Sequence, residues 1–357
     1  MTPTAPRVAF YAPMKAPDHP TPSGDREIAR LTMKALGLAG FTVELASDLR
    51  IWDKEGDCDV QTGLIAEAAK QTDQLLESLG DAPPDLWFTY HCYYKAPDLI
   101  GPQISRALGI PYVISEPSIS PRRTDGPWAA FAIASDDAIS AADRLFWITN
   151  RDRPALEDAG HGGKMVHLPA FLDPGPEPDR GDARDPLRLL TIAMMRAGDK
   201  VESYRRMAAA LVHMPRDWHL TIIGDGPARD QVERMFAPHA ARVNFVGAVD
   251  DAFQMREAYD AADLFLWPGV GEGVGMVFLE AQAAGVPVIA EDHPAQRDLV
   301  VTPLATPDRP MELADLIVQI AEDQKAHGAR ARSHIERRHS LQAAAARLGD
   351  VLRPLIR

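Results

Sequence analysis

Residues 267–290 read WPGVGEGVGMVFLEAQAAGVPVIA, and this stretch decides the fold class. Glycines at every second position over 269–275 predict a loop whose backbone can approach a ligand closely. The run 276–284 predicts a helix that Gly285 ends, and 286–290 predicts a buried strand. A glycine loop that opens into a helix offers free backbone N–H groups and positive dipole to an anion.

Two carboxylates lie at this loop-to-helix junction. Glu272 is in the glycine loop, and Glu280 comes eight residues later, two turns into the predicted helix. Glu280 follows the apolar run 276–279, where an unpaired charge would be costly. It is placed to reach neutral hydroxyls rather than the anion itself. A ligand with phosphate in the middle and polyols on both sides suits this arrangement, and a nucleotide sugar is such a ligand.

The stretch closely resembles the E-x7-E signature of retaining glycosyltransferases of family 4, which have the GT-B fold. Gly269 and Val274 stand where that pattern has serine and phenylalanine, and neither position carries a charge. The pattern is long and mixes residue types, so it is far more specific than a lone glycine motif. The matching positions are Pro268, Glu272, Gly273, Gly275, Glu280, Ala281, Gly285, Pro287, Val288, Ile289 and Ala290.

The resemblance implies a role for each polar group of this signature. Glu280 should accept hydrogen bonds from the ribose hydroxyls. Glu272 should contact hydroxyls of the transferred sugar and the positive charge that develops near its anomeric carbon. The backbone N–H groups expected to reach the sugar or the diphosphate are those of Gly273, Val274, Gly275 and Met276.

Two cations follow a predicted strand at 187–192. Arg196 and Lys200 match an arginine and a lysine that the family places against the diphosphate, although Val201 replaces the glycine that usually follows. Cations there would stabilise the leaving diphosphate more in the transition state than in the ground state. The alternative is an exposed loop with two ordinary surface charges. The signature downstream favours the functional interpretation.

Two further segments of the second half resemble family hallmarks. The first is the turn Gly224-Asp225-Gly226-Pro227, which ends a predicted strand. The second is 243–247, which in the family lines the nucleobase pocket. By position, Asn244 and Val246 should lie there. Backbone contacts usually recognise the base in this family, so these side chains leave its identity open.

In the first half, Gly24 follows the first predicted strand and opens a helix. The family has a glycine-rich loop at this place, bordering the diphosphate and the acceptor, and by position Gly24 carries that role. A simpler interpretation is open for its neighbours, because Ser23 or Asp25 could equally be a helix N-cap.

Polar groups at the ends of the next strands are candidates for contacts to the acceptor or the sugar. His91, Tyr94 and Lys95 follow the third predicted strand, although a lone histidine at a strand end is more often structural. Glu116 follows the fourth strand, at about the position where many family members have a histidine close to the transferred sugar. This substitution is the main departure from the family pattern.

Arg122 and Arg123 form a small basic loop with Trp128 and Phe131 nearby. A solvated turn is the simpler interpretation. The sharper one is a contact for a lipid or phosphorylated acceptor, through charge and interfacial aromatic side chains.

The Pro-rich run Asp173–Pro186 predicts a linker between two α/β units, because short apolar runs alternate with helical patterns on both sides of it. The resemblance implies two Rossmann-like domains with parallel sheets, 1–172 on the acceptor side and 187–335 for the nucleotide sugar, and an interdomain cleft. The final segment, 336–357, should return as a helix to the N-terminal domain. Between 291 and that helix the pattern predicts one other helix, near 311–324.

The bulk composition excludes several function classes. A net charge of −13 without a Lys/Arg run disfavours nucleic-acid binding. Asp57-Cys58-Asp59 is an Asp-x-Asp triplet in a polar stretch, which we interpret as a surface loop, so no metal and no cofactor is expected. No signal peptide or membrane span is visible, which predicts a cytoplasmic protein, free or peripheral at the inner face of the membrane.

The resulting hypothesis is a retaining, metal-independent enzyme that moves a hexose from a nucleotide diphosphate sugar, UDP-sugar favoured, to an acceptor hydroxyl. Its partners would be that donor and a lipid or saccharide acceptor, in glycolipid or cell-envelope polysaccharide synthesis. One alternative is a dinucleotide-dependent oxidoreductase, suggested by Gly271-x-Gly273-x-Gly275, whose spacing departs from the G-x-G-x-x-G fingerprint. Another is a GT-B protein that binds a nucleotide sugar without catalysis. The nucleobase, the linkage formed and the oligomeric state stay open.

Overall fold

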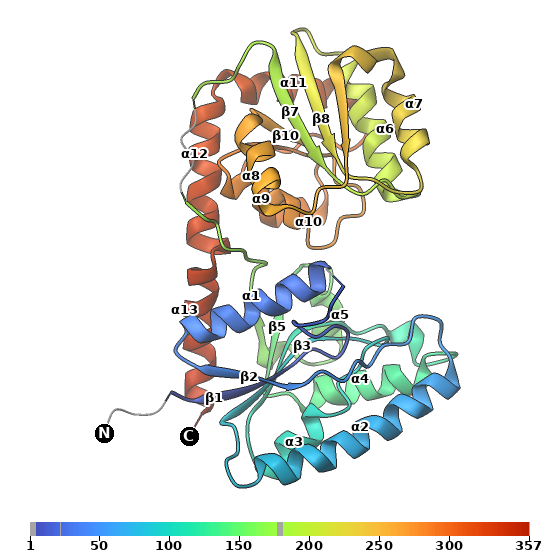
Figure 1. The fold of residues 1–357 in the computed structure, drawn as a ribbon, viewed down its shortest axis with the longest axis vertical. Coiled ribbons are helices and arrows are strands. Elements are labelled where there is room, and N and C mark those ends of the chain that lie inside the picture. The colour runs from blue at the N-terminus through green and yellow to red at the C-terminus, as the bar shows by residue number, and fades with distance from the viewer. Residues whose placement is uncertain (1–4, 22, 177–180, 357) are drawn as a thin grey trace. The chain divides into compact units, whose positions relative to one another are not determined.

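The structure is a computed structural model that describes residues 5–21, 23–176 and 181–356. The chain divides into two compact units, of which the first contains residues 1–170 and 341–357 and the second residues 171–340. Figure 1 shows helices on both faces of a sheet in each unit. Residues 177–180 of the predicted linker, and Pro22 beside the predicted N-cap, lie outside the described residues.

Unit 1 is built on a six-stranded parallel sheet in the order β2-β1-β3-β4-β5-β6. Its central strands are apolar on both faces because helices cover both. The strands are β1 (Arg7–Tyr11), β2 (Thr42–Ser47), β3 (Leu86–Cys92), β4 (Tyr112–Pro117), β5 (Arg144–Trp147) and β6 (Met165–His167).

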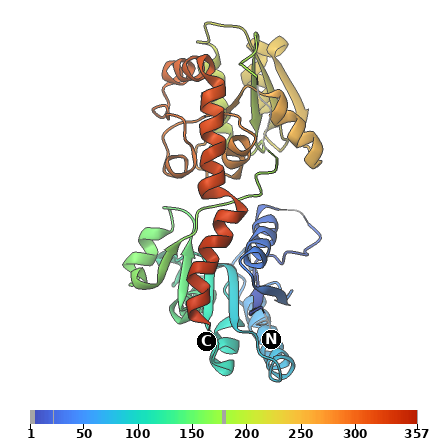
Figure 2. The same cartoon turned by 90° about the vertical axis from the view of Figure 1, so that its left-hand side faces the viewer.

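The helices of unit 1 form two layers. On one face α1 (Gly24–Leu38) packs against α13 (Leu341–Leu352), so the last helix of the chain belongs to this unit (Figure 2). The other face carries a buried core that includes Tyr11 and Trp87, both fully buried. The helices on that face are α2 (Cys58–Leu79), α3 (Gly101–Leu108) and α4 (Ala129–Ala141).

Unit 2 has a five-stranded parallel sheet in the order β11-β10-β7-β8-β9. The strands are β7 (Leu187–Ile192), β8 (Trp218–Ile223), β9 (Val243–Gly247), β10 (Leu264–Leu266) and β11 (Val288–Ile289). Helix α6 packs with α7 and α11, and α9 packs with α12. These helices are α6 (Asp199–Leu211), α7 (Arg229–Phe236), α9 (Met276–Ala283), α11 (Pro310–Glu322) and α12 (Gln324–His334), and α8 (Ala252–Ala261) lies next to β7.

Each sheet has a topological switch point beside its first strand. In unit 1, β1 pairs with β2 on one side and with β3 on the other. In unit 2, β7 pairs with β8 on one side and with β10 on the other. Open α/β sheets bind their ligands outside the carboxyl ends of the two strands at such a point. The strand order therefore selects two loops in each unit, those that follow β1 and β3 and those that follow β7 and β10.

The predicted single helix between 291 and the last helix was wrong. Besides α11, the structure has α10 (Pro294–Leu299), α12 and a π-helical turn, Ile335–His339. Helix α12 reads QKAHGARARSH and has no large apolar side chain. It packs through small residues instead, since a Cβ at Gly328 would overlap the carbonyl oxygen of Gly285. Large apolar side chains carry the periodic signal, so small-residue packing escapes it.

The predicted surface loop at Asp57-Cys58-Asp59 was also wrong. Asp57 is the N-cap of α2 and accepts hydrogen bonds from the backbone N–H groups of Asp59 and Val60, at 2.9 and 3.2 Å. The aspartates therefore begin a 22-residue helix. In the described part of the chain, no helix combines the length and apolarity that a bilayer crossing requires.

Candidate functional site

The β7/β10 switch point of unit 2 is bridged by an ion pair. Lys200, in the first turn of the helix after β7, donates a hydrogen bond to Oε1 of Glu272, in the loop after β10. The indole N–H of Trp267 donates to the same oxygen at 2.8 Å. The Lys200 ammonium also lies 5.3 Å from the centre of the Trp267 ring. Two residues that lie 72 positions apart in the chain are thus held together by the strand order.

The glycine loop is shaped by three of its four glycines. Gly269, Gly271 and Gly275 have φ of +81°, +65° and +61°, a region that side chains rarely adopt. A Cβ at Gly269 would overlap the buried Gln296 amide, and one at Gly275 would lie 2.8 Å from the Phe278 ring. These glycines are required by the protein's own packing.

Gly273 is different from its neighbours. Its φ is not positive, and a Cβ built there would have no atom of the described protein within 4 Å. Neither backbone strain nor packing requires a glycine at this position. A ligand that lies close to the backbone would require a glycine here, as the sequence pattern predicts.

Backbone donors gather directly after this loop. Among the described residues, the N–H groups of 273–277 have no hydrogen-bond partner, and they open helix α9. The N-cap Gly275 has no side chain that could supply one. Five successive free N–H groups at the positive end of a helix form a strong anion site. The four predicted donors, Gly273 to Met276, belong to this set.

Arg196 follows β7 and is exposed. Its guanidinium makes no hydrogen bond or ion pair with any described residue. The Gly224-Asp225-Gly226-Pro227 turn packs against the backbone just before it. The backbone carbonyl of Asp225 accepts a hydrogen bond from the N–H of Met195 at 2.9 Å, and a Cβ at Gly224 or Gly226 would overlap backbone there. The turn therefore supports the segment that carries Arg196.

Glu280 lies on α9, half-buried, and accepts a hydrogen bond from the hydroxyl of Tyr259 at 2.9 Å. Burial raises the pKa of Glu280, against a smaller lowering by that hydrogen bond. Its second oxygen, Oε1, has no partner among the described residues. An acceptor oxygen left open beside the anion site suits the predicted contact with ribose hydroxyls.

We expect Glu280→Gln to stabilise the protein at neutral pH while weakening nucleotide binding about tenfold or more, since a charged acceptor is lost. The pKa of Glu280 is higher in the folded protein than in the unfolded chain. As the pH rises between these two pKa values, the unfolded chain loses the carboxyl proton first, and the free energy of unfolding falls. The stabilisation of Glu280→Gln over the unchanged protein should therefore become smaller at acidic pH. Urea unfolding at about pH 4 and about pH 8 measures it.

Glu322→Gln serves as a control for this prediction, since Glu322 is exposed near the end of α11 in the same unit. A stability change in Glu280→Gln that is the same at both pH values would contradict the assignment.

Asn244 and Val246 alternate along β9, an edge strand, and both side chains are exposed. The carbonyl of Gly247, at the end of this strand, accepts the N–H of Gly224 at 2.7 Å. Val246 thus lies near the turn, and Asn244 lies further from the carboxyl end of the strand. Their role at the nucleobase stays a prediction.

The β1/β3 switch point of unit 1 is also bridged by a polar pair. Oδ1 of Asp25, in the first turn of α1, lies 2.8 Å from Nδ1 of His91, the second-last residue of β3. Ser23 is the helix N-cap and accepts from the N–H of Arg26, so one of the two capping options is confirmed. Gly24 has no positive φ, and a Cβ there would meet nothing within 4 Å. Like Gly273, it is a glycine that the fold does not need.

His91 and Glu116 end neighbouring strands in the same strained conformation, with φ of +60° and +56°. Burial lowers the pKa of His91, but the carboxylates of Glu116 and Asp25 outweigh it and the net shift is upward. Burial raises the pKa of Glu116, against opposing effects of His91 and Tyr90. Strain of this kind costs about 1–3 kcal/mol per residue and concentrates at functional sites. The structure thus brings Glu116 and His91 together, which the sequence did not predict.

Tyr94 and Lys95 contact a different partner, the basic loop. Lys95 and Arg123 both lie 4.9 Å from the centre of the Trp128 ring. The ring of Tyr94 meets that of Trp128 edge-on, with centroids 5.8 Å apart. Arg122 is exposed on the same 3-10 turn, Pro121–Arg123, and has no partner among the described residues.

Several residues around the β7/β10 switch point were missed from the sequence. Trp267 and Tyr259 look like core aromatics in the chain, and only their hydrogen bonds to Glu272 and Glu280 reveal a second role. Ser203 accepts the N–H of Val270 at 3.0 Å and ties the glycine loop to α6. No motif marks these positions. Only the position of Trp267, directly before the E-x7-E signature, could have pointed to it from the sequence.

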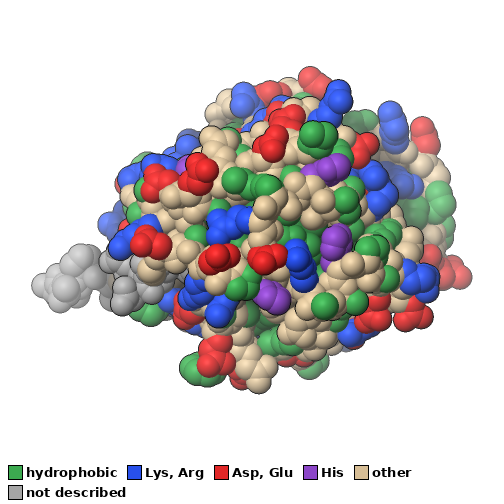
Figure 3. Space-filling view, turned by 90° about the horizontal axis from the view of Figure 1, so that it is seen from above, with side chains coloured by type: hydrophobic (Ala, Val, Ile, Leu, Met, Phe, Trp, Pro, Cys, Tyr) green, Lys and Arg blue, Asp and Glu red, His purple; other side chains and the backbone are tan. Residues whose placement is uncertain are grey.

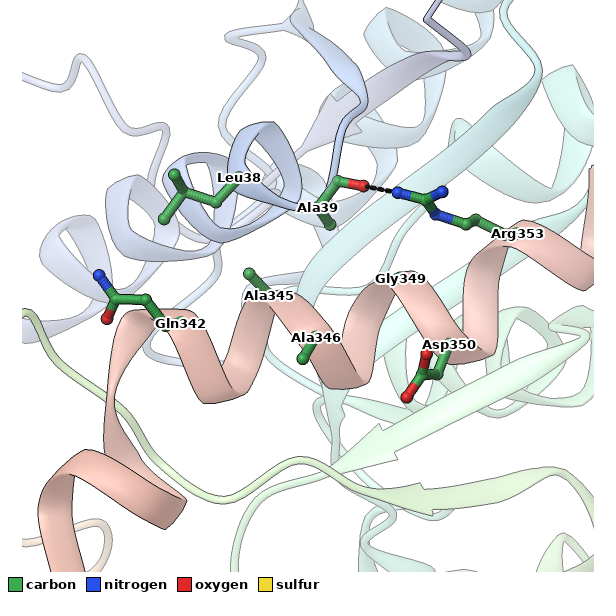
Figure 4. Close-up of a pocket in the computed structure, with 8 residues that line it drawn as sticks. All are labelled: Leu38, Ala39, Gln342, Ala345, Ala346, Gly349, Asp350 and Arg353. Atoms are coloured by element: carbon green, nitrogen blue, oxygen red, sulfur yellow. Dashed lines mark hydrogen bonds between the residues drawn. The ribbon is translucent and has the colours of Figure 1, made fainter. Parts of the chain in front are cut away.

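A cavity of about 440 Å³ lies elsewhere in unit 1, between the end of α1 and α13. Figure 4 shows Arg353 reaching across it to the carbonyl oxygen of Ala39, at 2.6 Å. It adjoins the C-terminus of α1, whereas the switch point adjoins the N-terminus, and a 15-residue helix is roughly 22 Å long. The cavity is therefore separate from the candidate site.

Charge is mixed on the face of the molecule that Figure 3 shows, where acidic and basic side chains are interspersed. The described residues contain no group of three or more His, Cys, Asp or Glu that could hold a metal ion. The candidate donor site is accordingly defined by Arg196, Lys200, Glu272, Glu280 and the free N–H groups of 273–277.

Comparison with known families decides what this arrangement belongs to. The family model "Glycosyl transferases group 1" matches residues 186–323. The chain carries a glycosyl transferases group 1 domain. This domain lies entirely within unit 2 and contains Lys200, Glu272 and Glu280. The resemblance drawn from residues 267–290 is thereby confirmed at the level of this domain.

The curated relatives that match parts of this chain are glycosyltransferases. The alpha-D-kanosaminyltransferase of Streptomyces kanamyceticus is 27% identical, over 62% of this chain and 64% of its own length. A GDP-mannose-dependent phosphatidylinositol monomannoside mannosyltransferase of Corynebacterium glutamicum is 28% identical, over 52% and 55%. The phosphatidyl-myo-inositol mannosyltransferase of Mycobacterium tuberculosis is 34% identical, over 34% and 36%. The chain thus spans about a third to two thirds of these relatives.

Solved structures show the fold of the whole chain. Sucrose-phosphate synthase from Thermosynechococcus elongatus has a TM-score of 0.69 at 18% identity, over 98% of this chain and 99% of its own. Anabaena HepE in complex with UDP has a TM-score of 0.70 at 16% identity, over 98% and 100%. The predicted GT-B fold is confirmed.

Proposed function

We propose that the protein is a retaining glycosyltransferase that moves a hexose from a nucleotide diphosphate sugar to an acceptor hydroxyl, without a divalent metal. The single observation that carries this proposal is the Lys200–Glu272 pair at the β7/β10 switch point, beside five free N–H groups. The cation suits the leaving phosphate, and the carboxylate suits the reacting sugar. The row of backbone donors suits the diphosphate.

The pair can serve both sides of the bond that breaks. Lys200 uses one N–H on Glu272 and keeps two for phosphate oxygens. Glu272 accepts at Oε1 from Lys200 and Trp267, and its Oε2 has no partner among the described residues. That oxygen is available to sugar hydroxyls and to positive charge at the anomeric carbon. Arg196, exposed and unpaired in the described chain, supplies the second cation.

The proposed step balances as follows. The bond between the anomeric carbon and the diphosphate oxygen breaks, and the acceptor oxygen bonds to the same face of that carbon. The acceptor's proton passes to the leaving phosphate oxygen. Arg196 and Lys200 stabilise the negative charge of the leaving group, and Glu272 stabilises the positive charge of the sugar. Because fixed cations take this role, turnover is expected to survive EDTA.

The relatives support a choice of substrates to test first. One is named as GDP-mannose-dependent and two act on phosphatidylinositol or its mannoside, whereas HepE was solved with UDP. We propose a UDP-sugar as the donor, a GDP-sugar as the next candidate, and a lipid or saccharide acceptor in glycolipid or cell-envelope polysaccharide synthesis.

Thermal unfolding with UDP-, GDP- and ADP-sugars tests the donor. A ligand at a hundredfold excess over its dissociation constant stabilises the folded state by about 2.7 kcal/mol. We expect one nucleotide to give a clear rise in Tm and the others little. No response to any of them would count against the proposed function as a whole.

Two further measurements separate the alternatives. Donor consumption with and without an added acceptor distinguishes a transferase from a protein that binds nucleotide sugars without turning them over. A nicotinamide difference spectrum tests the oxidoreductase alternative, for which the loop 271–275 has the wrong glycine spacing. We expect consumption of the donor and no nicotinamide signal.

A further inference from the structure

The basic loop of unit 1 and the nearby Lys95 lie on a buried polar network. Asp53 is 4% exposed and accepts hydrogen bonds from three backbone N–H groups, those of Glu55, Gly56 and Asp57, at 2.9–3.0 Å. The Gln61 amide, 2% exposed, also donates to Asp53 at 2.7 Å. A buried carboxylate satisfied in this way fixes the loop 53–57 in one conformation.

This polar network forms direct hydrogen bonds to the segment that follows the two arginines of the basic loop. Gln61 donates to the carbonyl of Pro127 at 2.8 Å, and the indole N–H of Trp128 donates to the carbonyl of Asp53 at 3.2 Å. Gly56 has φ of +82°, and a Cβ there would lie 3.2 Å from the Trp128 ring. The loop 53–57 and the segment 127–128 are therefore locked together.

Two cations rest on this locked surface. The Lys95 ammonium donates to the carbonyl of Lys54 at 3.1 Å and lies over the Trp128 ring. Arg123 stacks at 4.9 Å from Trp128 and 5.2 Å from Tyr94. Neither cation has a carboxylate partner among the described residues, and the Asp53 carboxylate is already satisfied by amides. Stacking leaves the N–H edge of a guanidinium free.

A series of ring contacts connects the Lys95 and Arg123 pair on Trp128 to the β1/β3 switch point. His91 stacks on Tyr93 at 4.7 Å, Tyr93 meets Tyr94 at 5.6 Å, and Tyr94 meets Trp128 at 5.8 Å. These ring contacts connect His91 with the two cations, all within unit 1.

We propose that Lys95 and Arg123, on the Tyr94–Trp128 ring pair, bind a phosphate group of the acceptor substrate. The proposal rests on the proposed function, since it gives the acceptor a phosphate at a distance from the hydroxyl that reacts. Phosphate fits because its oxygens accept from both a guanidinium fork and an ammonium, and Arg122 adds a third positive charge beside them. The phosphate can belong to a free sugar or polyol phosphate or to a lipid headgroup.

The test removes both charges and keeps the side-chain stems, in the double variant Lys95→Met/Arg123→Gln. Arg106→Gln is the matched control, because Arg106 is exposed on α3 in the same unit and makes no ion pair with a described residue. Titrations use inorganic phosphate and glucose 6-phosphate, with glucose as the uncharged counterpart. UDP is kept saturating, so that the N–H groups of 273–277 do not compete for the probe. Co-sedimentation uses phosphatidylcholine vesicles with and without phosphatidylinositol.

We expect the double variant to bind the phosphate probe at least tenfold more weakly than the unchanged protein and the control, with UDP affinity equal in all three. Binding to a soluble phosphate identifies a free acceptor, and binding only to phosphatidylinositol vesicles identifies a lipid headgroup. Two results would overturn the proposal. One is equal phosphate binding by the double variant and the unchanged protein, and the other is no binding by the unchanged protein to inorganic phosphate, glucose 6-phosphate or phosphatidylinositol vesicles. A protein that binds phosphate here but binds and consumes no nucleotide sugar would instead overturn the proposed function.

Discussion

Replacing Arg196 by alanine is expected to lower kcat by about 10²–10³-fold while leaving the thermal unfolding midpoint unchanged. The two expectations have one origin. The Arg196 side chain is exposed and makes no hydrogen bond or ion pair with a described residue, so its removal breaks none of these in the folded protein. Its function in our proposal is confined to the charge that develops on the leaving diphosphate. A group that acts only in the transition state lowers kcat and kcat/KM together.

The same strand offers a matched control for this experiment. Arg188 lies near the amino end of β7, is exposed, and its side chain has no ion-pair partner among the described residues. Arg188→Ala should retain the full rate, because it lies at the opposite end of the strand from the switch point. Lys200→Met should lose rate to a similar degree and also some stability, since Glu272 then keeps only Trp267 as a partner. Near-normal turnover of Arg196→Ala would remove Arg196 from the mechanism.

The glycine loop should give opposite results at two of its positions. Gly269→Ala is expected to destabilise the protein by roughly 2–4 kcal/mol, because its φ is +81° and its Cβ would overlap the buried Gln296 side chain. Gly273→Ala is expected to leave stability unchanged or slightly raised, because a Cβ there meets nothing. It should nevertheless lower kcat/KM about 10²-fold, since a displaced donor sugar no longer meets Glu272.

Urea unfolding and donor turnover, measured on both variants, separate the two effects. Gly63→Ala provides a baseline for a glycine with open space around it. Gly63 lies on α2 in unit 1, far in sequence from the glycine loop 269–275. An alanine at 273 that turns over donor as fast as the unchanged protein would show that this glycine has no ligand beside it.

Most residues of the candidate donor site could be singled out from the sequence because they are close together in the chain. The glycines, Glu272 and Glu280 all fall within 269–280, where local backbone geometry and helix spacing relate them directly. Lys200 was predicted together with Arg196, from the family resemblance of the segment that follows a strand. That it contacts Glu272 could not be predicted, because the order of β7 and β10 in the sheet leaves no mark in either segment.

The candidate residues of unit 1 were harder to predict, because their partners lie far from them in the sequence. His91, Tyr94 and Lys95 were expected to form one cluster because they adjoin in the chain, yet His91 turns to Asp25 and Glu116 while Lys95 turns to Trp128. No motif marks Asp53 and Gln61 in the sequence, and only their burial and hydrogen bonds show that they hold the basic loop.

The residues alone predict the alternation of strands and helices, the glycine loop and the family resemblance. They also show which charged side chains and backbone donors a nucleotide sugar would meet. These depend on interactions between neighbours in the chain, which periodicity and turn chemistry report. The strand order of each sheet decides the rest, since it places Lys200 against Glu272 and Asp25 against His91 at the two switch points. Hydrogen bonds between parallel strands join backbones whatever their side chains, so this order becomes visible only when the whole core is packed.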